Sequence, residues 1–189
     1  SVLKYFDGKI DAVLDGGECG IGCESTLIDL SRTPYRILRQ GALPADEIAD
    51  AFVDSMKIIG ITGGTGCGKT TALNELERRG ALLIDCDAVY HRMLETDRPM
   101  LDEIEKYFPG AVIDGKLDRK ALGAVVFTDE EALRDLNIIT HRHINLEIRR
   151  ILREHAMNGG TLAAIDAIEL FSSGLAKRCT ATIGVIADR

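Results

Sequence analysis

Residues 56–71 read MKIIGITGGTGCGKTT, and this stretch decides the fold. The apolar run Ile58–Ile61 predicts a buried parallel strand, and the residues from Lys69 onward predict an amphipathic helix. Between them, residues 63–70 fit the pattern G-x-x-x-x-G-K-[ST], the phosphate-binding P-loop. This order of strand, glycine-rich turn and helix predicts an α/β domain that binds a nucleotide triphosphate.

The chemistry of the loop predicts a site for ATP and Mg²⁺. Glycines let successive backbone N–H groups point into one concavity, and the positive end of the helix adds to the field there. We expect Lys69 to contact the β- and γ-phosphates and the hydroxyl of Thr70 to ligate the metal. A glycine-rich surface turn is the alternative interpretation of the loop. The expected ATP-binding residues are Gly64, Thr65, Gly66, Cys67, Gly68, Lys69, Thr70 and Thr71.

The composition predicts a globular, cytoplasmic protein. Of 189 residues, 46% are hydrophobic and 28% charged, and no apolar run approaches the roughly 18 residues that cross a membrane. Five cysteines without a secretion signal indicate free thiols, and Cys19 and Cys23 have no second pair with zinc-site spacing. The net charge of −7 argues against direct nucleic-acid binding. No membrane partner is expected, and assembly into a homo-oligomer is left open.

Charge balance and element pattern change near residue 55. Residues 1–55 carry 5 basic and 10 acidic side chains, a net charge of −5, whereas residues 56–189 carry 18 and 20, a net charge of −2. The smaller part is too short for an independent core, so it is interpreted as an accessory subdomain or a piece of a larger domain. Its expected elements are strands over residues 10–15, 25–30 and 36–39 and a helix over about residues 44–53 that begins at Pro44.

Carboxylates follow the second strand of the larger part. Residues 81–84 predict this strand, which leads into Asp85 and Asp87. Because open α/β sheets bind ligands at the carboxyl ends of their strands, a carboxylate there can face the phosphates; N-capping of the next helix is the alternative role. His141 and His143 lie two apart on a long helix, so they point to different faces and form no metal pair. The remaining expected elements are helices over about residues 97–108, 118–127 and 133–155 and strands over residues 161–165 and 181–186, which complete a doubly wound parallel sheet.

The surroundings of the P-loop favour a small-molecule kinase. No N/T-K-x-D guanine motif is present, which argues against a GTPase. A carboxylate at the end of the very next strand suits a kinase, in which an acid orients or deprotonates the acceptor hydroxyl. A P-loop kinase for another small hydroxylated acceptor and a non-catalytic nucleotide-binding module are the alternatives.

From Met56 onward the chain resembles dephospho-CoA kinase. The resemblance implies ATP-dependent phosphorylation of the 3′-hydroxyl of dephospho-CoA, the last step of coenzyme A synthesis. It implies that Asp87 is the general base, that Lys69 holds the phosphates during transfer, and that Arg119 and His141 bind the acceptor or support the site. The matching segments are IGITGGTGCGKTT (59–71), LIDCDAVYHRML (83–94), DGKLDRKALGAVVF (114–127), ITHRHI (139–144) and AIDAIELFSSGL (164–175).

The chain departs from this family in three places. The family commonly has Pro and an apolar residue where this chain has Arg142-His143, and Glu where it has Ser172. The family also continues into an arginine-rich lid, a fifth strand and an adenine-contacting segment, which residues 56–189 lack. Because a lid supplies positive charge to the transferred phosphoryl group, we expect this chain to bind ATP weakly and to turn over slowly or not at all.

Residues 1–55 resemble the last portion of a threonylcarbamoyl-AMP synthase, which makes the adenylate used in the t⁶A modification of tRNA. The matching segments are DGKIDAVLDGG (7–17), GCESTLIDL (22–30) and RILRQGALPADEI (36–48). The resemblance implies that Ser25, Thr26 and Arg39 come from a nucleotide and substrate site. Because the body of that family is absent, we expect a remnant without a working site; a biological role set by this part, in trans with its missing body, is the alternative.

Overall fold

The centre of the molecule is a four-stranded, fully parallel sheet. The computed structural model describes residues 2–18, 20, 22–64 and 66–187. The strands lie in the order β4 (Leu82–Asp85), β7 (Leu162–Asp166), β3 (Lys57–Thr62) and β8 (Ala181–Gly184). The two inner strands, β7 and β3, carry small and β-branched side chains that are buried on both faces of the sheet, as parallel strands require.

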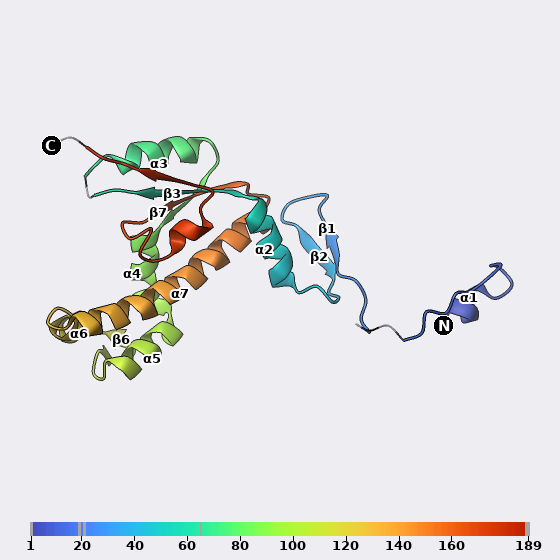
Figure 1. The fold of residues 1–189 in the computed structure, drawn as a ribbon, viewed down its shortest axis with the longest axis horizontal. Coiled ribbons are helices and arrows are strands. Elements are labelled where there is room, and N and C mark those ends of the chain that lie inside the picture. Colours follow the sequence, from blue (N-terminus) through green and yellow to red (C-terminus); the bar gives the residue numbers. More distant parts are fainter. Residues whose placement is uncertain (1, 19, 21, 65, 188–189) are drawn as a thin grey trace.

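Helices cover both faces of the sheet. Figure 1 shows α3 (Lys69–Arg78) on one side of the sheet and the long helix α7 (Glu130–Met157) on the other. Three shorter helices, α4 (Cys86–Thr96), α5 (Arg98–Tyr107) and α6 (Arg119–Val126), pack around α7, and η1 (Leu175–Arg178) precedes β8. The predicted doubly wound α/β fold is therefore confirmed.

The core lies between the sheet and α7. Ile148 and Leu152 of α7 and Ile165 of β7 are completely buried in one apolar cluster. By contrast α3, which was predicted as an amphipathic helix, has no buried residue among Lys69–Arg78. The apolar stripe of α7 therefore contributes more to this fold than that of α3.

A two-stranded hairpin lies between the helices expected over residues 97–108 and 118–127. Val112–Ile113 (β5) pair with Lys116–Leu117 (β6), and the turn between them is Asp114-Gly115 with φ angles of 51° and 72°. Two left-handed residues in a two-residue loop are typical of a type I′ turn, for which Asp-Gly is a favoured sequence. The dipeptide was therefore a usable signal for this hairpin.

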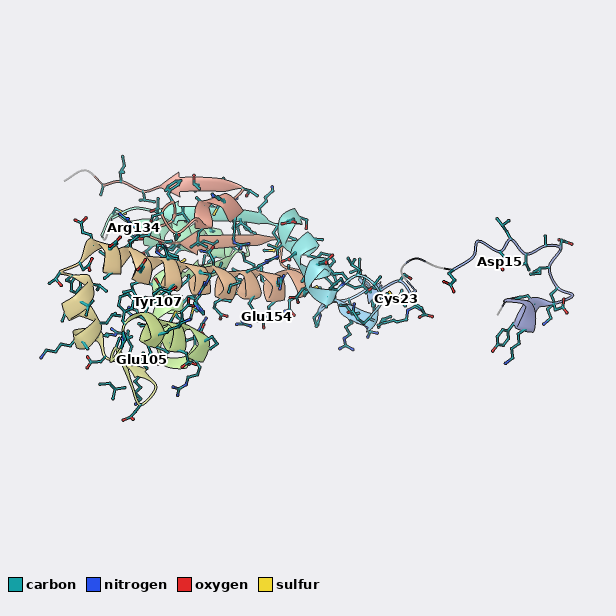
Figure 2. All side chains as sticks on the ribbon, turned by 60° about the horizontal axis from the view of Figure 1, so that its bottom comes forward. Asp15, Cys23, Glu105, Tyr107, Arg134 and Glu154 are labelled. Carbon is teal, nitrogen blue, oxygen red and sulfur yellow. The ribbon has the colours of Figure 1, made fainter. Side chains whose placement is uncertain are left out.

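The N-terminal part is a small hairpin preceded by an extended arm. Leu27–Asp29 (β1) pair antiparallel with Arg36–Arg39 (β2), which confirms two of the three predicted strands. The strand expected over residues 10–15 is wrong, because no strand pairs with this segment in the described chain and Leu14 is 98% exposed. Figure 1 shows α1 (Val2–Phe6) far from the sheet, and Figure 2 places Asp15 on the arm between them.

Helix α2 (Ala45–Ser55) joins the hairpin to β3. It forms close to where a helix was expected, with Pro44 at its N-cap instead of inside its first turn. Its residues Ile48, Ala49 and Val53 are buried. In the part of the chain that the structure describes, no helix is long and apolar enough to span a bilayer.

Candidate active site

The P-loop has the backbone that its glycines allow. Strand β3 ends at Thr62, and α3 begins at Lys69, with Gly63, Gly66 and Gly68 between them at φ angles of 150°, 80° and 92°. A Cβ atom on Gly63 would lie 2.4 Å from the carbonyl oxygen of Val185 on the neighbouring chain segment. The loop can therefore follow this path only with glycine at that position. Thr65, one of the expected ATP-binding residues, lies outside the described residues.

Lys69 lies over its own loop. Its ammonium group donates hydrogen bonds to the carbonyl oxygens of Gly63, at 2.8 Å, and Gly64, at 3.4 Å. The side chain is only 15% exposed. Thr70 and Thr71 follow in the first turn of α3 with exposed side chains, and the thiol of Cys67 is half-buried. The charged and hydroxyl groups expected to contact phosphate and metal therefore lie together at the start of α3.

Asp166 is an acidic neighbour of Lys69 that the sequence analysis did not single out. It ends β7 opposite Asp85 of β4, and its Oδ1 lies 4.0 Å from Lys69 Nζ. This oxygen is buried and has no hydrogen-bond partner among the described residues. Burial raises the pKa of Asp166, Lys69 opposes that shift, and the charges of Asp85 and Asp87 add to it. The site thus holds one lysine and a group of carboxylates at the carboxyl edge of the sheet.

The two aspartates after β4 have different structural roles. Asp85 is the N-cap of α4, because its Oδ1 accepts hydrogen bonds from the backbone N–H groups of Asp87, at 2.9 Å, and Ala88, at 3.1 Å. Asp87 lies in the first turn, where its exposed side chain lines a cavity. The capping alternative thus applies to Asp85, and the side chain of Asp87 lies where it can meet a ligand.

This cavity, of about 290 Å³, lies between α4, α7 and the segment after β7. Apolar side chains form much of its wall, and polar groups from three elements interrupt it, as in sites for organic ligands. His141 is one of these groups, with its Nε2 3.3 Å from Glu169 Oε2. The lining residues that carry polar side chains are Asp87, Tyr90, Asn137, Thr140, His141, Glu169 and Ser173.

Arg119 is not among the residues that line the cavity. Its Nη2 is 3.4 Å from Nδ1 of His91 on α4. It also lies close to Tyr90, a cavity residue: burial raises the pKa of Tyr90, and the charge of Arg119 opposes that rise. Among the predicted acceptor-binding residues, the structure therefore brings Asp87 and His141 to one cavity, whereas Arg119 contacts His91, the residue next to Tyr90 of the cavity wall.

The three residues singled out in the N-terminal part also lie together. Arg39 donates hydrogen bonds from Nε to the carbonyl oxygen of Ser25, at 3.2 Å, and from Nη2 to its hydroxyl, at 3.3 Å. Thr26 Oγ1 accepts from the N–H of Gly41, at 2.9 Å, and donates to the carbonyl oxygen of Leu43, at 2.8 Å. Each of these contacts joins parts of the hairpin to its own loops.

The parallel sheet, the P-loop at the end of its central strand and a carboxylate facing a cavity at the same edge define a P-loop kinase fold. The chain belongs to the dephospho-CoA kinase family, whose model matches residues 57–189. It is 41% identical over 136 residues to a dephospho-CoA kinase of Anaeromyxobacter dehalogenans, covering 71% of this chain and 64% of that protein. It is 37% identical over 134 residues to one of Aquifex aeolicus, covering 70% of this chain and 67% of that protein. The chain thus spans about two thirds of the length of these relatives.

A solved structure and a second family match complete the comparison. The crystal structure of TT1252 from Thermus thermophilus is similar with a TM-score of 0.55 and 34% sequence identity, covering 70% of this chain and 66% of that one. The family described as telomere recombination matches residues 1–41. This match fits the resemblance of the N-terminal part to the end of a threonylcarbamoyl-AMP synthase.

Proposed function

We propose that this chain carries the catalytic centre of a dephospho-CoA kinase, which transfers the γ-phosphoryl group of ATP to the 3′-hydroxyl of dephospho-CoA. One observation carries the proposal: the cavity that contains Asp87 opens at the same carboxyl edge of the sheet as the P-loop lysine, Lys69. A donor and an acceptor bound at these two places would meet across that edge. The named relatives support the choice of dephospho-CoA as the acceptor.

The phosphates of ATP would lie in the loop between β3 and α3. Backbone N–H groups of residues 64–71 and the start of α3 favour negative charge there. Lys69, now over the carbonyl oxygens of Gly63 and Gly64, would move its ammonium group to the β- and γ-phosphates. The loop therefore supplies both the geometry and the charge for binding a polyphosphate.

The residues of this edge also fit Mg²⁺. The metal prefers oxygen ligands, and the edge presents the exposed hydroxyl of Thr70 together with the carboxylates of Asp85 and Asp166. The buried, unpartnered Oδ1 of Asp166 is a group that a cation nearby would satisfy. Bound with ATP, Mg²⁺ would neutralise charge that develops on the phosphates.

Asp87 would act on the acceptor. Its carboxylate is exposed to the cavity and is not engaged as a helix cap, so it can accept the proton of the 3′-hydroxyl as that oxygen attacks the γ-phosphorus. His141, paired with Glu169 on the opposite element, would bind and orient the acceptor. Arg119 would support this wall through Tyr90 and His91.

A comparison of acceptors tests the proposal. ADP release would be measured with dephospho-CoA, adenosine, other nucleosides and simple sugars, and binding of each would be measured by calorimetry. We expect turnover and saturable binding with dephospho-CoA and neither with the sugars. Faster turnover with another hydroxylated compound would instead favour a kinase for that acceptor. ATP binding without turnover on any acceptor would favour a non-catalytic module.

We also propose that the reaction takes place in the reducing cytoplasm. The thiols of Cys23, Cys67, Cys86 and Cys179 are free, which supports a reducing, cytoplasmic setting. Burial raises the pKa of Cys86 to about 12, with the charges of Asp85 and Asp87 adding to the shift. This thiol thus remains protonated and unreactive beside the site.

A further inference from the structure

Helix α2 lies between the two regions that match known families. The N-terminal match ends at residue 41 and the kinase match begins at residue 57, so neither includes α2 (Ala45–Ser55). Linkers between domains are usually exposed and rich in polar residues, glycine or proline. The contacts of α2 are of a different kind.

One side of α2 is part of the kinase core. Val53 is 8% exposed and Met56, its C-cap, is 3% exposed. Both belong to the apolar cluster that contains Ile148 and Leu152 of α7, and Phe52 packs against that cluster. A flexible linker would leave these side chains in water, so their burial stabilises the docked position.

A charged contact lies beside this apolar one. Asp50 of α2 accepts hydrogen bonds on both carboxylate oxygens from Arg149 and Arg153 of α7, among them Arg153 Nε at 2.6 Å and Arg153 Nη2 at 2.7 Å. Arg153 Nη1 also donates to Asp46, at 2.7 Å. Two arginines on one carboxylate hold the pKa of Asp50 far below its usual range. Such paired, forked contacts fix geometry as well as add energy.

The hairpin side makes a third contact with the end of α7. The N–H of Tyr35 donates to the carbonyl oxygen of Met157, at 2.8 Å, and the ring of Tyr35 stacks on Phe52 with centroids 5.0 Å apart. A Cβ on Gly159 would lie 2.6 Å from Thr33 Cγ2, so the loop before Tyr35 lies directly against the turn that follows α7. Figure 1 shows α2 and the hairpin together at this end of α7.

We propose that α2 and the loop of residues 33–35 form a permanent docking interface, which holds the end of the synthase-like unit on the C-terminal end of kinase helix α7. The partner of this face of α7 is thus a segment of the same chain. The interface lies beyond the cavity on α7, because Arg149 is five residues, about 7.5 Å along the helix, past Ile144, the last α7 residue that lines the cavity. No residue of α2 or of the loop of residues 33–35 lines that cavity. The docked unit therefore leaves the acceptor cavity open.

Amide hydrogen exchange on the full chain tests this interface. We expect the amides of α2 to be protected in the wild type, and the variant Asp50→Arg to lose about tenfold or more of that protection, because it places a third arginine against Arg149 and Arg153. The double variant Asp50→Arg with Arg149→Asp is expected to restore it. Asp54→Arg is the matched control, since it makes the same change of charge on an exposed residue of the same helix.

Other outcomes would overturn the proposal. If the wild-type α2 amides exchange at the rate of an unfolded peptide, α2 is a free linker. If Asp50→Arg and Asp54→Arg lose equal amounts of amide protection, the ion pairs of Asp50 do not hold the helix. If Asp50→Arg unfolds, so that β7 also exchanges freely, Tyr35→Ala takes its place. We expect Tyr35→Ala to reduce amide protection in β1, β2 and α2 and to leave the protection of β7 and nucleotide binding unchanged. Any other result would contradict the proposed interface.

Discussion

Asp166 Oδ1 and Lys69 Nζ lie 4.0 Å apart at the carboxyl edge of the sheet, one at the end of β7 and the other at the start of α3. The lysine bonds to two loop carbonyl oxygens, and the aspartate oxygen has no hydrogen bond among the described residues. A buried oxygen without a partner destabilises the chain unless something satisfies it. The pair therefore indicates that the carboxyl edge of the sheet is suited to binding a ligand, at a cost to the stability of the ligand-free chain.

Asp166 is expected to destabilise the ligand-free chain at neutral pH. The pKa of Asp166 is higher in the folded chain than its ordinary value of 3.8, so the folded chain binds the carboxyl proton more tightly than the unfolded chain does. The free energy of unfolding therefore falls as pH rises from 3.8 through the raised pKa. We expect Asp166→Asn to stabilise the ligand-free chain at pH 7 by about 1 kcal/mol, a rise in Tm of about 2–4 °C, and to remove most of this pH dependence. Thermal unfolding between pH 4 and pH 7 measures it; a lower Tm of the variant at pH 7 would contradict it.

Lys69 is expected to contribute to nucleotide binding. Lys69→Met removes the positive charge of the loop while keeping much of the side-chain volume, so the affinity for ATP with Mg²⁺ should fall at least about tenfold. Calorimetric titration measures the Kd. Lys106→Met, on the exposed side of α5, is the control and should bind as the wild type does. Equal affinity of all three proteins would mean that the loop does not hold the phosphates.

Gly63 is expected to be required for the fold of the loop. A Cβ there would clash with the backbone of Val185, and a side chain rarely adopts the φ of 150°. We expect Gly63→Ala to lower the free energy of unfolding by about 1–3 kcal/mol. A Cβ on Gly64 would meet nothing within 4 Å, so Gly64→Ala should change it by less than about 0.5 kcal/mol. Urea unfolding measures both variants. Similar losses in their free energy of unfolding would show that the close approach of Gly63 to Val185 is not the source of the effect.

The ion pairs of Asp50 are expected to stabilise the folded chain in a way that depends on pH. Its pKa is lowered in the folded chain, so its ion pairs stabilise fully above the ordinary value of 3.8 and lose that effect as pH falls through the folded value. We expect Asp50→Asn to lower the free energy of unfolding by about 1–2 kcal/mol at pH 7, a range that allows for the partial exposure of the two arginines. The difference between variant and wild type should shrink below about pH 4. Urea unfolding at pH 7 and pH 3 measures it, and a constant difference would rule out the ion pairs as its source.

Local patterns predicted most of the elements, since each depends on neighbouring residues. The P-loop between β3 and α3 follows from its glycines, and Asp97, Asp118 and Asp129 cap helices as short polar residues do. The strand expected over residues 10–15 failed for the opposite reason. A strand also needs a partner, and the pattern of residues 10–15 carries no information about pairing.

The site was only partly predictable for the same reason. Asp87 and His141 were expected to act together and line one cavity. Asp166 was not predicted as a site residue, because its position beside Lys69 depends on β7 lying between β4 and β3, and a single sequence does not reveal the order of strands in a sheet. Glu169 is another such residue, since its contact with His141 joins segments 28 residues apart.

The most direct test of the account is the rate of dephospho-CoA-dependent ADP release by Asp87→Asn against the wild type, with ATP affinity measured on the same samples. If Asp87 accepts the proton of the acceptor hydroxyl, the rate should fall by about 10²–10⁴-fold while the Kd for ATP stays within a factor of about two. A variant that keeps its rate within about threefold would contradict the central claim, because a carboxylate that takes the proton cannot be replaced by an amide without loss.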